Sequence, residues 1–284
     1  MKYITFLIQC SDSKGLLAGI TAFFYDNNFN ILSCQQHTDL YTDKYFMRIK
    51  LDMSDLKMSR SDLEESFAKF AEPFKLNWSV SYSDAIPRVA IMVSKTTHCL
   101  YDILQKKQEG DLRCEIPLII SNHPDLEFVA DQFKIPYYCF PMTKANKAEQ
   151  EKQILELLDK HHIDLVVMAR YMQILSEDFV KRYNYKIINI HHAFLPAFQG
   201  ARPYMRAYEK GVKLIGATAH YATAELDEGP IIEQDVERVS HESSPEDLMR
   251  IGKDIERRVL SSAIRAHLDN QIIITNNRTI IFSS

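Results

Sequence analysis

The sequence predicts an α/β protein with two domains: a small amino-terminal βαββαβ domain and a larger domain with a mostly parallel sheet. Two consecutive β-α-β units fill residues 1–82, and a short polar stretch follows them. Beyond residue 88, continuous apolar runs alternate with helical segments, as is typical of strands covered on both faces. The 284 residues suffice for two hydrophobic cores. We expect a first domain at 1–83, a linker at 84–87 and a second domain at 88–284.

The amino-terminal domain has the element order of a ferredoxin-like fold. We expect strands near residues 3–9, 30–40, 45–51 and 76–82, with helices near 16–27 and 61–73. The turn before the first helix holds Asp12 and Gly15, where glycine permits close approach of the backbone and a helix amino terminus favours a carboxylate. A plain helix-capping turn explains these two residues equally well.

The second domain has the element order of a Rossmann-like, doubly wound sheet. We expect strands near residues 88–93, 116–120, 136–140, 164–169 and 187–190, with helices near 100–108, 125–133 and 147–162. Ligands of such sheets bind beyond the carboxyl ends of the strands. Glycine is scarce, with eight residues, and neither a Gly-x-Gly-x-x-Gly motif nor a P-loop occurs, so no nucleotide cofactor is expected.

Composition argues against several classes of partner. The formal net charge of -4 offers no general attraction to nucleic acid. No apolar run approaches the roughly 20 residues that span a bilayer, and the amino terminus reads as a strand, not an export signal. Five scattered cysteines without Cys-x-x-Cys spacing favour reduced thiols in a cytoplasmic protein. Neighbouring histidines make poor joint chelators, so no metal site is expected at the two His-His pairs.

A candidate active site lies where the run Ile188–Ile190 ends. Alternate side chains of a strand share a face, so Asn189 and His191 should project together while His192 turns the other way. An amide can donate to an oxygen that becomes negative, and an imidazole can polarise that oxygen or pass a proton. Asp227, on a turn between two apolar runs, supplies a carboxylate. Taken singly, a strand-end histidine can serve the backbone, and Asp227 can be a simple turn former.

Three ordered motifs give the chain a resemblance to a known family. Asn-x-His at Asn189, Leu-Pro-x-Phe-x-Gly at Leu195 and Leu-Asp-x-Gly-Pro-Ile at Leu226 resemble those of the folate-dependent formyltransferases. The fuller run from Val167 to Leu175 and on to Tyr204 is most similar to the formyltetrahydrofolate deformylases. That family also carries an amino-terminal ACT domain, so the resemblance covers essentially the whole chain.

Departures from the motifs separate this chain from the other relatives. The segment Ser94–Leu100 lacks the glycine-serine-asparagine loop with which glycinamide ribonucleotide transformylases grip a phosphate. The chain ends about fifty residues after Pro230, without the basic domain of methionyl-tRNA formyltransferases. Ala193 stands where deformylases commonly have serine, which affects one expected hydrogen bond.

The resemblance implies hydrolysis of 10-formyltetrahydrofolate to tetrahydrofolate and formate, with no further cofactor. Asp227 would position and deprotonate water, directly or through His191. Asn189 would donate to the tetrahedral oxyanion, and His191 would stabilise that oxygen and protonate the departing N10. The family's two folate loops correspond here to residues 170–175 and 222–227. The resemblance implies pterin contacts through backbone atoms of Gln173, Leu175, Thr223 and Ala224, while Met172 and Ala222 would line the apolar wall. Without the resemblance, Met172, Ile174 and Leu175 would be taken as ordinary core residues.

The resemblance also implies regulation and assembly. An ACT domain would bind an amino-acid effector, methionine or glycine, near Asp12, Gly15, Asn30 and Ile31, and would pair side by side in a homo-oligomer. The reaction would supply formate for purine synthesis and balance the one-carbon folate pool. Two alternatives stay open: transfer of the formyl group to a small amine, and an idle ACT regulator without turnover. The sequence leaves open the number of subunits, the effector's sign and the polyglutamate preference.

Overall fold

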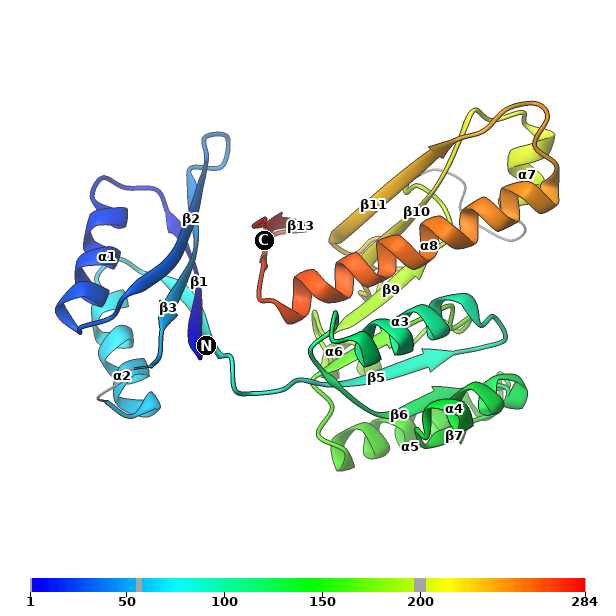
Figure 1. Ribbon diagram of the computed structural model, residues 1–284, viewed down its shortest axis with the longest axis horizontal. Coiled ribbons are helices and arrows are strands. Elements are labelled where there is room, and N and C mark those ends of the chain that lie inside the picture. The colour runs from blue at the N-terminus through cyan, green and yellow to red at the C-terminus, as the bar shows by residue number, and fades with distance from the viewer. Residues whose placement is uncertain (1, 55–57, 197–202, 284) are drawn as a thin grey trace. The chain divides into compact units, whose positions relative to one another are not determined.

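The chain forms two compact units. The structure, a computed structural model, describes residues 2–54, 58–196 and 203–283. Its contacts group Met1–Ile86 with Asp269–Ser284 as one unit and Pro87–Leu268 as the other (Figure 1). The assignment of 88–284 to a single domain therefore needs a correction for its last residues. The described part of 269–284 is an apolar hairpin whose Ile273 and Phe282 pack on Phe46 of the first unit.

The first unit contains one antiparallel sheet with two helices on one face (Figure 1). Its four strands are ordered β2-β3-β1-β4, and this βαββαβ arrangement confirms the ferredoxin-like prediction. A cluster of aromatic rings, including Phe6, Phe24, Phe67 and Trp78, fills the space between sheet and helices. The elements are β1 (Tyr3–Ser11), α1 (Leu16–Asp26), β2 (Ile31–Asp39), β3 (Lys44–Asp52), α2 (Arg60–Ala71) and β4 (Asn77–Tyr82).

The first unit is completed by the hairpin of β12 (Ile272–Thr275) and β13 (Arg278–Ile281). Arg48 of β3 ties the start of this segment down, because its Nε donates to the carbonyl of Asn270 at 2.8 Å and its Nη2 to that of Asp269 at 3.0 Å. Arg48 is buried, and burial of a guanidinium without hydrogen bonds is unfavourable. These two hydrogen bonds offset that cost.

The second unit is built on a seven-stranded sheet in the order β11-β10-β9-β8-β5-β6-β7. The five strands from β5 to β9 pair in parallel, whereas β10 and β11 pair antiparallel, which confirms the mostly parallel prediction. The strands are β5 (Arg88–Val93), β6 (Glu115–Ser121), β7 (Tyr137–Cys139), β8 (Leu165–Met168), β9 (Ile187–His191), β10 (Leu214–Tyr221) and β11 (Ile231–Arg238).

Helices cover both faces of this sheet, as the continuous apolar strands require. One core forms between the strands and α5 (Lys147–Lys160) and α6 (Glu177–Arg182). On the near face in Figure 1, α3 (His98–Glu109) packs beside α8 (Pro245–Leu268), which also lies along β9, β10 and β11. The remaining elements are the short helix η1 (Pro124–Leu126), α4 (Glu127–Phe133) and α7 (Pro203–Glu209).

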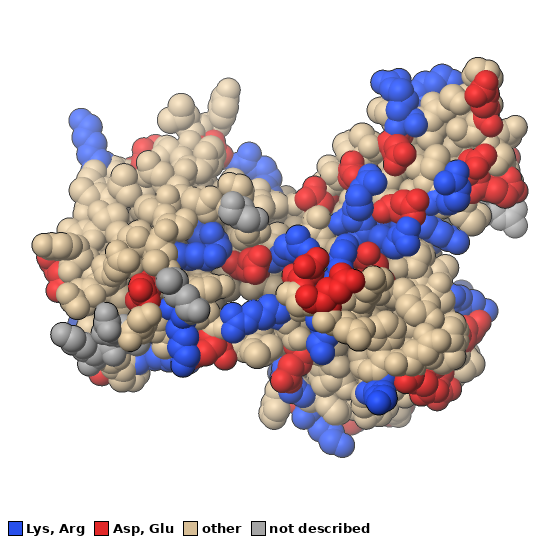
Figure 2. Space-filling model, in the orientation of Figure 1, with Lys and Arg blue, Asp and Glu red and all other residues tan. Residues whose placement is uncertain are grey.

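The long helix α8 begins at a capping box. The hydroxyl of Ser244 accepts from the Asp247 backbone N–H at 3.1 Å, and the Asp247 carboxylate accepts from the Ser244 N–H at 3.2 Å. Basic and acidic side chains lie intermixed on the face of the molecule that Figure 2 shows, and Arg258 of α8 pairs with Asp235 of β11 at 2.6 Å. Within the described ranges, no helix is both long and apolar enough to cross a membrane.

Candidate active site

A cleft of about 840 Å³ opens beyond the carboxyl ends of β5, β8 and β9. These three strands are neighbours in the sheet, with Met92 opposite Met168 and Met168 opposite Asn189. The residues that follow each strand therefore meet in one place, as expected for a doubly wound sheet. The lining includes Thr96 and His98 after β5, Arg170 to Ile174 after β8, Asn189 to His192 from β9, Leu226 and Asp227 from the β10–β11 turn, and residues of α7 and α8.

The structure brings Asn189, His191 and Asp227 together in this cleft. Asn189 and His191 occupy alternate positions at the end of β9, and both line the cavity. Asp227 reaches them from the turn between β10 and β11, so its carboxylate oxygen lies 3.2 Å from Nδ1 of His191. Its backbone has a positive φ of 59°, an uncommon conformation for a residue with a Cβ.

The carboxylate of Asp227 determines how His191 presents its ring. The hydrogen bond from His191, followed by the interaction with the nearby His220 ring, holds the pKa of Asp227 well below its ordinary value. An ionised carboxylate can only accept, so the hydrogen-bond network assigns the proton of neutral His191 to Nδ1. Its Nε2 is buried and has no hydrogen-bond partner among the described residues. His191 thus holds a basic nitrogen ready for a group bound in the cleft.

His220 is a further member of the site that the sequence did not suggest. It lies on β10 directly opposite Asn189, and its Nε2 is 3.2 Å from the Asn189 amide nitrogen and 3.6 Å from Asp227. Its Nδ1 must donate to the carbonyl of Tyr221 at 3.0 Å, because that carbonyl can only accept. Neutral His220 therefore accepts from the Asn189 amide, which aligns that amide. Only the strand register could have identified this contact.

The expectation that His192 turns away from the site is wrong. Its ring stacks on His191, with the ring centroids 5.0 Å apart and the planes at 15°, and both histidines line the cleft. The strand ends at His191, so the regular alternation of side chains ends there too. His192 is therefore a second imidazole beside the reacting positions.

The residues expected to contact folate divide into two groups. Met172 and Gln173 line the cleft, with Met172 59% exposed, whereas Leu175 is buried in the core of the second unit. The others, Ala222, Thr223 and Ala224, lie on the turn before Asp227 and are not part of the wall. Ile174 and Leu226 are also 59% exposed and line the cleft. Large exposed apolar side chains in a concave site are typical of a binding site for a ligand with apolar surface.

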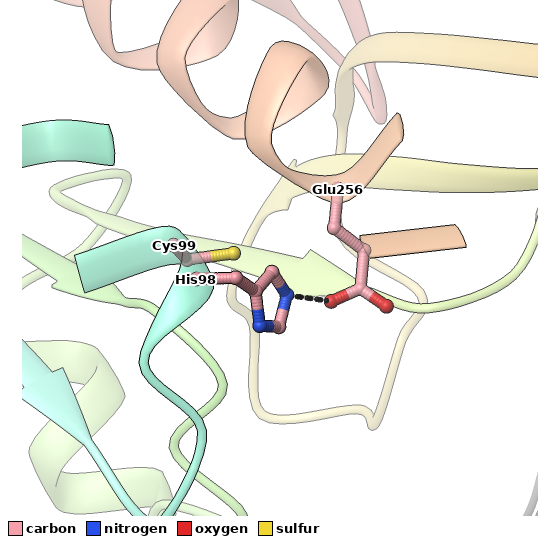
Figure 3. Close-up of side chains that lie close together, drawn as sticks. All are labelled: His98, Cys99 and Glu256. Atoms are coloured by element: carbon pink, nitrogen blue, oxygen red, sulfur yellow. Dashed lines mark hydrogen bonds and ion pairs between the residues drawn. The ribbon is translucent and has the colours of Figure 1, made fainter. Parts of the chain in front are cut away.

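A buried polar network forms the opposite part of the wall. Glu256 of α8 is 1% exposed and accepts a hydrogen bond from Nε2 of His98 at 2.7 Å (Figure 3). It also accepts one from the Tyr204 hydroxyl at 2.7 Å. The guanidinium of Arg170 lies 3.5 Å from the same carboxylate. Burial alone would raise the pKa of Glu256, but the His98 hydrogen bond and the charge of Arg170 hold it below its ordinary value.

The side chains of His98, Cys99 and Glu256 lie close enough to be considered as a metal site (Figure 3). Their chemistry fits a cation poorly. Arg170 already supplies a positive charge to Glu256, and His98 Nε2 is engaged with the same carboxylate. Burial, followed by the negative charge of Glu256, raises the pKa of Cys99 well above its ordinary value, whereas the thiolate is the form that binds metal. The group is better described as a hydrogen bond between His98 and Glu256 beside a buried thiol.

The residues expected to bind an effector do not gather in the first unit. Asp12 and Gly15 line a hollow of about 580 Å³, but Asn30 and Ile31 do not. Strands β1 and β2 both run antiparallel to β3, so the end of β1 lies beside the start of β3 whereas the start of β2 lies beside the end of β3. Gly15 also acts differently from the expectation, because no atom approaches its Cβ position and its φ of 90° is what requires glycine.

Two further expectations concern motif and cysteine positions. Phe198, Gln199 and Gly200 of the Leu-Pro-x-Phe-x-Gly motif lie outside the described residues. All five cysteines are free, as expected, although only Cys99 and Cys114 are buried.

Comparison with known proteins agrees with this geometry. A model of the formyl transferase family matches residues 87–264. The formyltetrahydrofolate deformylase of Synechocystis sp. is 52% identical over 279 residues, which cover 98% of each chain. This chain belongs to the formyltetrahydrofolate deformylase family. The deformylase of Bacillus subtilis is 46% identical over 98% of this chain and 93% of its own length.

Solved structures distinguish the deformylase family from its shorter relatives. The crystal structure of a formyltetrahydrofolate deformylase from Pseudomonas syringae pv. tomato has a TM-score of 0.97 and 40% identity, and the match covers 100% of this chain and 95% of that one. Glycinamide ribonucleotide transformylase 1 from Symbiobacterium toebii has a TM-score of 0.66 and 30% identity, over 71% of this chain and 97% of its own. The deformylase family thus shares both units, whereas the transformylase matches a smaller part.

Proposed function

We propose that the protein hydrolyses 10-formyltetrahydrofolate to tetrahydrofolate and formate at the Asn189, His191 and Asp227 cleft. The observation that carries this proposal is the pairing of Asp227 with Nδ1 of His191, which leaves Nε2 available beside an amide donor. This combination suits attack on a formamide carbon, because the reaction needs a base for water, a donor for the oxyanion and an acid for the departing nitrogen.

The reaction proceeds in two steps. Nε2 of His191 takes a proton from water as the water oxygen attacks the formyl carbon, and Asn189 donates to the oxygen that becomes negative. Both oxygens of Asp227 already face imidazoles, at 3.2 Å and 3.6 Å, which favours the route through His191 over direct deprotonation by Asp227. The C–N10 bond then breaks as the His191 imidazolium protonates N10. The second product is formic acid, which ionises to formate.

The folate rings would lie on the apolar part of the wall. Met172, Ile174 and Leu226 expose large apolar surfaces there, and a flat heterocycle would cover them. The Met172 backbone is fixed by its N–H, which donates to the Ser94 hydroxyl at 2.9 Å. Gln173 beside it is a candidate for hydrogen bonds to the pterin.

The test is turnover of purified protein with 10-formyltetrahydrofolate alone in water enriched in oxygen-18. Hydrolysis predicts equal yields of formate and tetrahydrofolate, with one solvent oxygen in each formate. Formate that forms only when a small amine is added would instead indicate transfer. Absence of turnover with all three residues intact would favour a regulatory protein.

We further propose that the first unit is an ACT domain that binds methionine or glycine. Support comes from the ferredoxin-like sheet and from the hollow next to Asp12, which is also lined by Gln36 and Thr38. The edge strand β2, with Leu32 38% exposed, suits side-by-side pairing into a homo-oligomer. Calorimetry with each amino acid and light scattering of the intact chain test these two points. Free cysteines fit a cytoplasmic location. The formate released by the proposed hydrolysis would supply purine synthesis.

A further inference from the structure

The cleft holds a positively charged group that the proposed reaction does not use. Arg170 follows β8 and lines the cavity, and its Nε and Nη1 atoms are buried without a hydrogen-bond partner among the described residues. Glu256 balances the charge of Arg170 but does not hydrogen-bond to these nitrogens. Its nearest oxygen is 3.5 Å from Nε, and its two oxygens already accept from His98 and Tyr204. A buried charged donor without an acceptor is unfavourable, so an acceptor is expected in the cleft.

A second donor lies in the same wall. The hydroxyl of Thr96, which follows β5, is buried and likewise has no hydrogen-bond partner within residues 2–54, 58–196 and 203–283. Strand β5 pairs with β8, so the segments that carry Thr96 and Arg170 leave the sheet side by side. The two side chains together offer a planar guanidinium and a hydroxyl, which suit the two oxygens of a carboxylate.

The backbone around Arg170 is specially held. Its φ of 64° lies in the left-handed region, which is uncommon for a residue with a Cβ. Hydrogen bonds fix it on both sides, since the Ala169 N–H donates to the Met92 carbonyl at 2.9 Å and the Met172 N–H donates to the Ser94 hydroxyl. Such conformations persist where the surrounding structure over-determines them, and they are concentrated at ligand sites.

We infer that Arg170 and Thr96 form a carboxylate site that receives the formate released by hydrolysis. This inference rests on the proposed function, which generates a small carboxylate at the neighbouring strand. Met168 of β8 is in register with Asn189 of β9. Arg170 lies two residues after Met168, and His191 lies two residues after Asn189. Arg170 and His191 therefore occupy corresponding positions at the ends of neighbouring strands. The other source of carboxylates is the glutamate portion of the folate. Formate fits better because the unsatisfied nitrogens of Arg170 are buried and not on an open surface.

The experiment compares formate binding in three variants of the intact chain. Arg170→Lys keeps the charge beside Glu256 but removes the planar fork, and Thr96→Val removes a hydroxyl that has no partner in the part of the chain that the structure describes. Arg182→Lys is the matched control, since Arg182 pairs with Asp159 outside the cleft. Formate affinity is measured by calorimetry without substrate and as inhibition of turnover. We expect both cleft variants to bind formate about tenfold more weakly, and the control to bind it normally.

Three results would overturn the assignment. They are wild-type protein that does not bind formate, cleft variants that bind it normally, and cleft variants that lose affinity for p-aminobenzoylglutamate instead. The last result would assign the site to the folate's glutamate. The calorimetric measurement does not require turnover, so failure of this inference is distinguishable from failure of the proposed hydrolysis. Thermal unfolding of each variant without ligand checks that lost binding does not reflect lost folding.

Discussion

Replacement of Asn189 by alanine separates the chemical role of the amide from its structural role. In the folded protein its amide makes one hydrogen bond, to His220 at 3.2 Å, and the side chain is only partly buried. Loss of one such bond should lower the free energy of unfolding by about 1 kcal/mol. Loss of an oxyanion donor typically lowers turnover by about 10²- to 10³-fold, or roughly 3 to 4 kcal/mol of transition-state stabilisation. The expected kinetic effect is therefore much larger than the effect on stability.

The assay is steady-state release of formate and tetrahydrofolate, together with urea unfolding of the same preparations. Asn27→Ala is a suitable control, because its partly buried amide also donates one hydrogen bond, to the Phe23 carbonyl at 2.8 Å, and it lies in the first unit, away from the cleft. Both variants should unfold at similar urea concentrations, and only Asn189→Ala should lose turnover, with little change in KM. Turnover of Asn189→Ala within a few-fold of wild type would refute the oxyanion role.

Three other substitutions test the site and its support. Asp227→Asn should lower turnover by about 10³- to 10⁴-fold, because His191 loses its ionised acceptor. The depressed pKa of Asp227 keeps the native carboxylate ionised throughout the neutral pH range, so the loss should be the same across that range. A variant that regains wild-type turnover at any neutral pH would contradict this role. Gly229→Ala should destabilise the protein by about 1 to 3 kcal/mol in thermal unfolding, because the new Cβ would overlap the Tyr221 carbonyl; wild-type stability would show that the turn can shift. Burial lowers the pKa of His267 from 6.5 to about 4, so the unfolded chain binds a proton that the native state does not, and the free energy of unfolding should fall by about 3 kcal/mol as the pH drops through that window. His267→Asn, which can still accept from Tyr221, should remove this slope; an unchanged slope in urea titrations would assign it to another group.

The sequence was most informative where one local pattern determines the structure. Continuous apolar runs located β5, β8 and β9, since a strand covered on both faces has no polar side to show. The order of those strands placed Asn189 and His191 at a carboxyl edge. The motif Leu-Asp-x-Gly-Pro marked the turn that carries Asp227. These three residues were therefore predictable without coordinates.

Other parts of the site depend on contacts that the sequence does not express. His220 reaches Asn189 because of the register between β9 and β10, and Glu256 joins His98 across 158 positions of the chain. Helix α8 was not predicted, although the Ser244 and Asp247 capping box marks its start. The last hairpin was assigned to the wrong unit, since an apolar strand does not reveal which core it will cover.

The return of the last hairpin to the first unit affects the order in which the molecule can be assembled during synthesis. Residues 87–268 form a continuous stretch, so the larger unit has all its contacts once residue 268 has emerged. The first unit is synthesised earlier but is completed later, because Phe46 stays exposed until Ile273 and Phe282 have been synthesised. A nascent chain interrupted near residue 268 would contain a complete second unit and a first unit whose Phe46 is still exposed. Such a product is a natural target for chaperones and proteases.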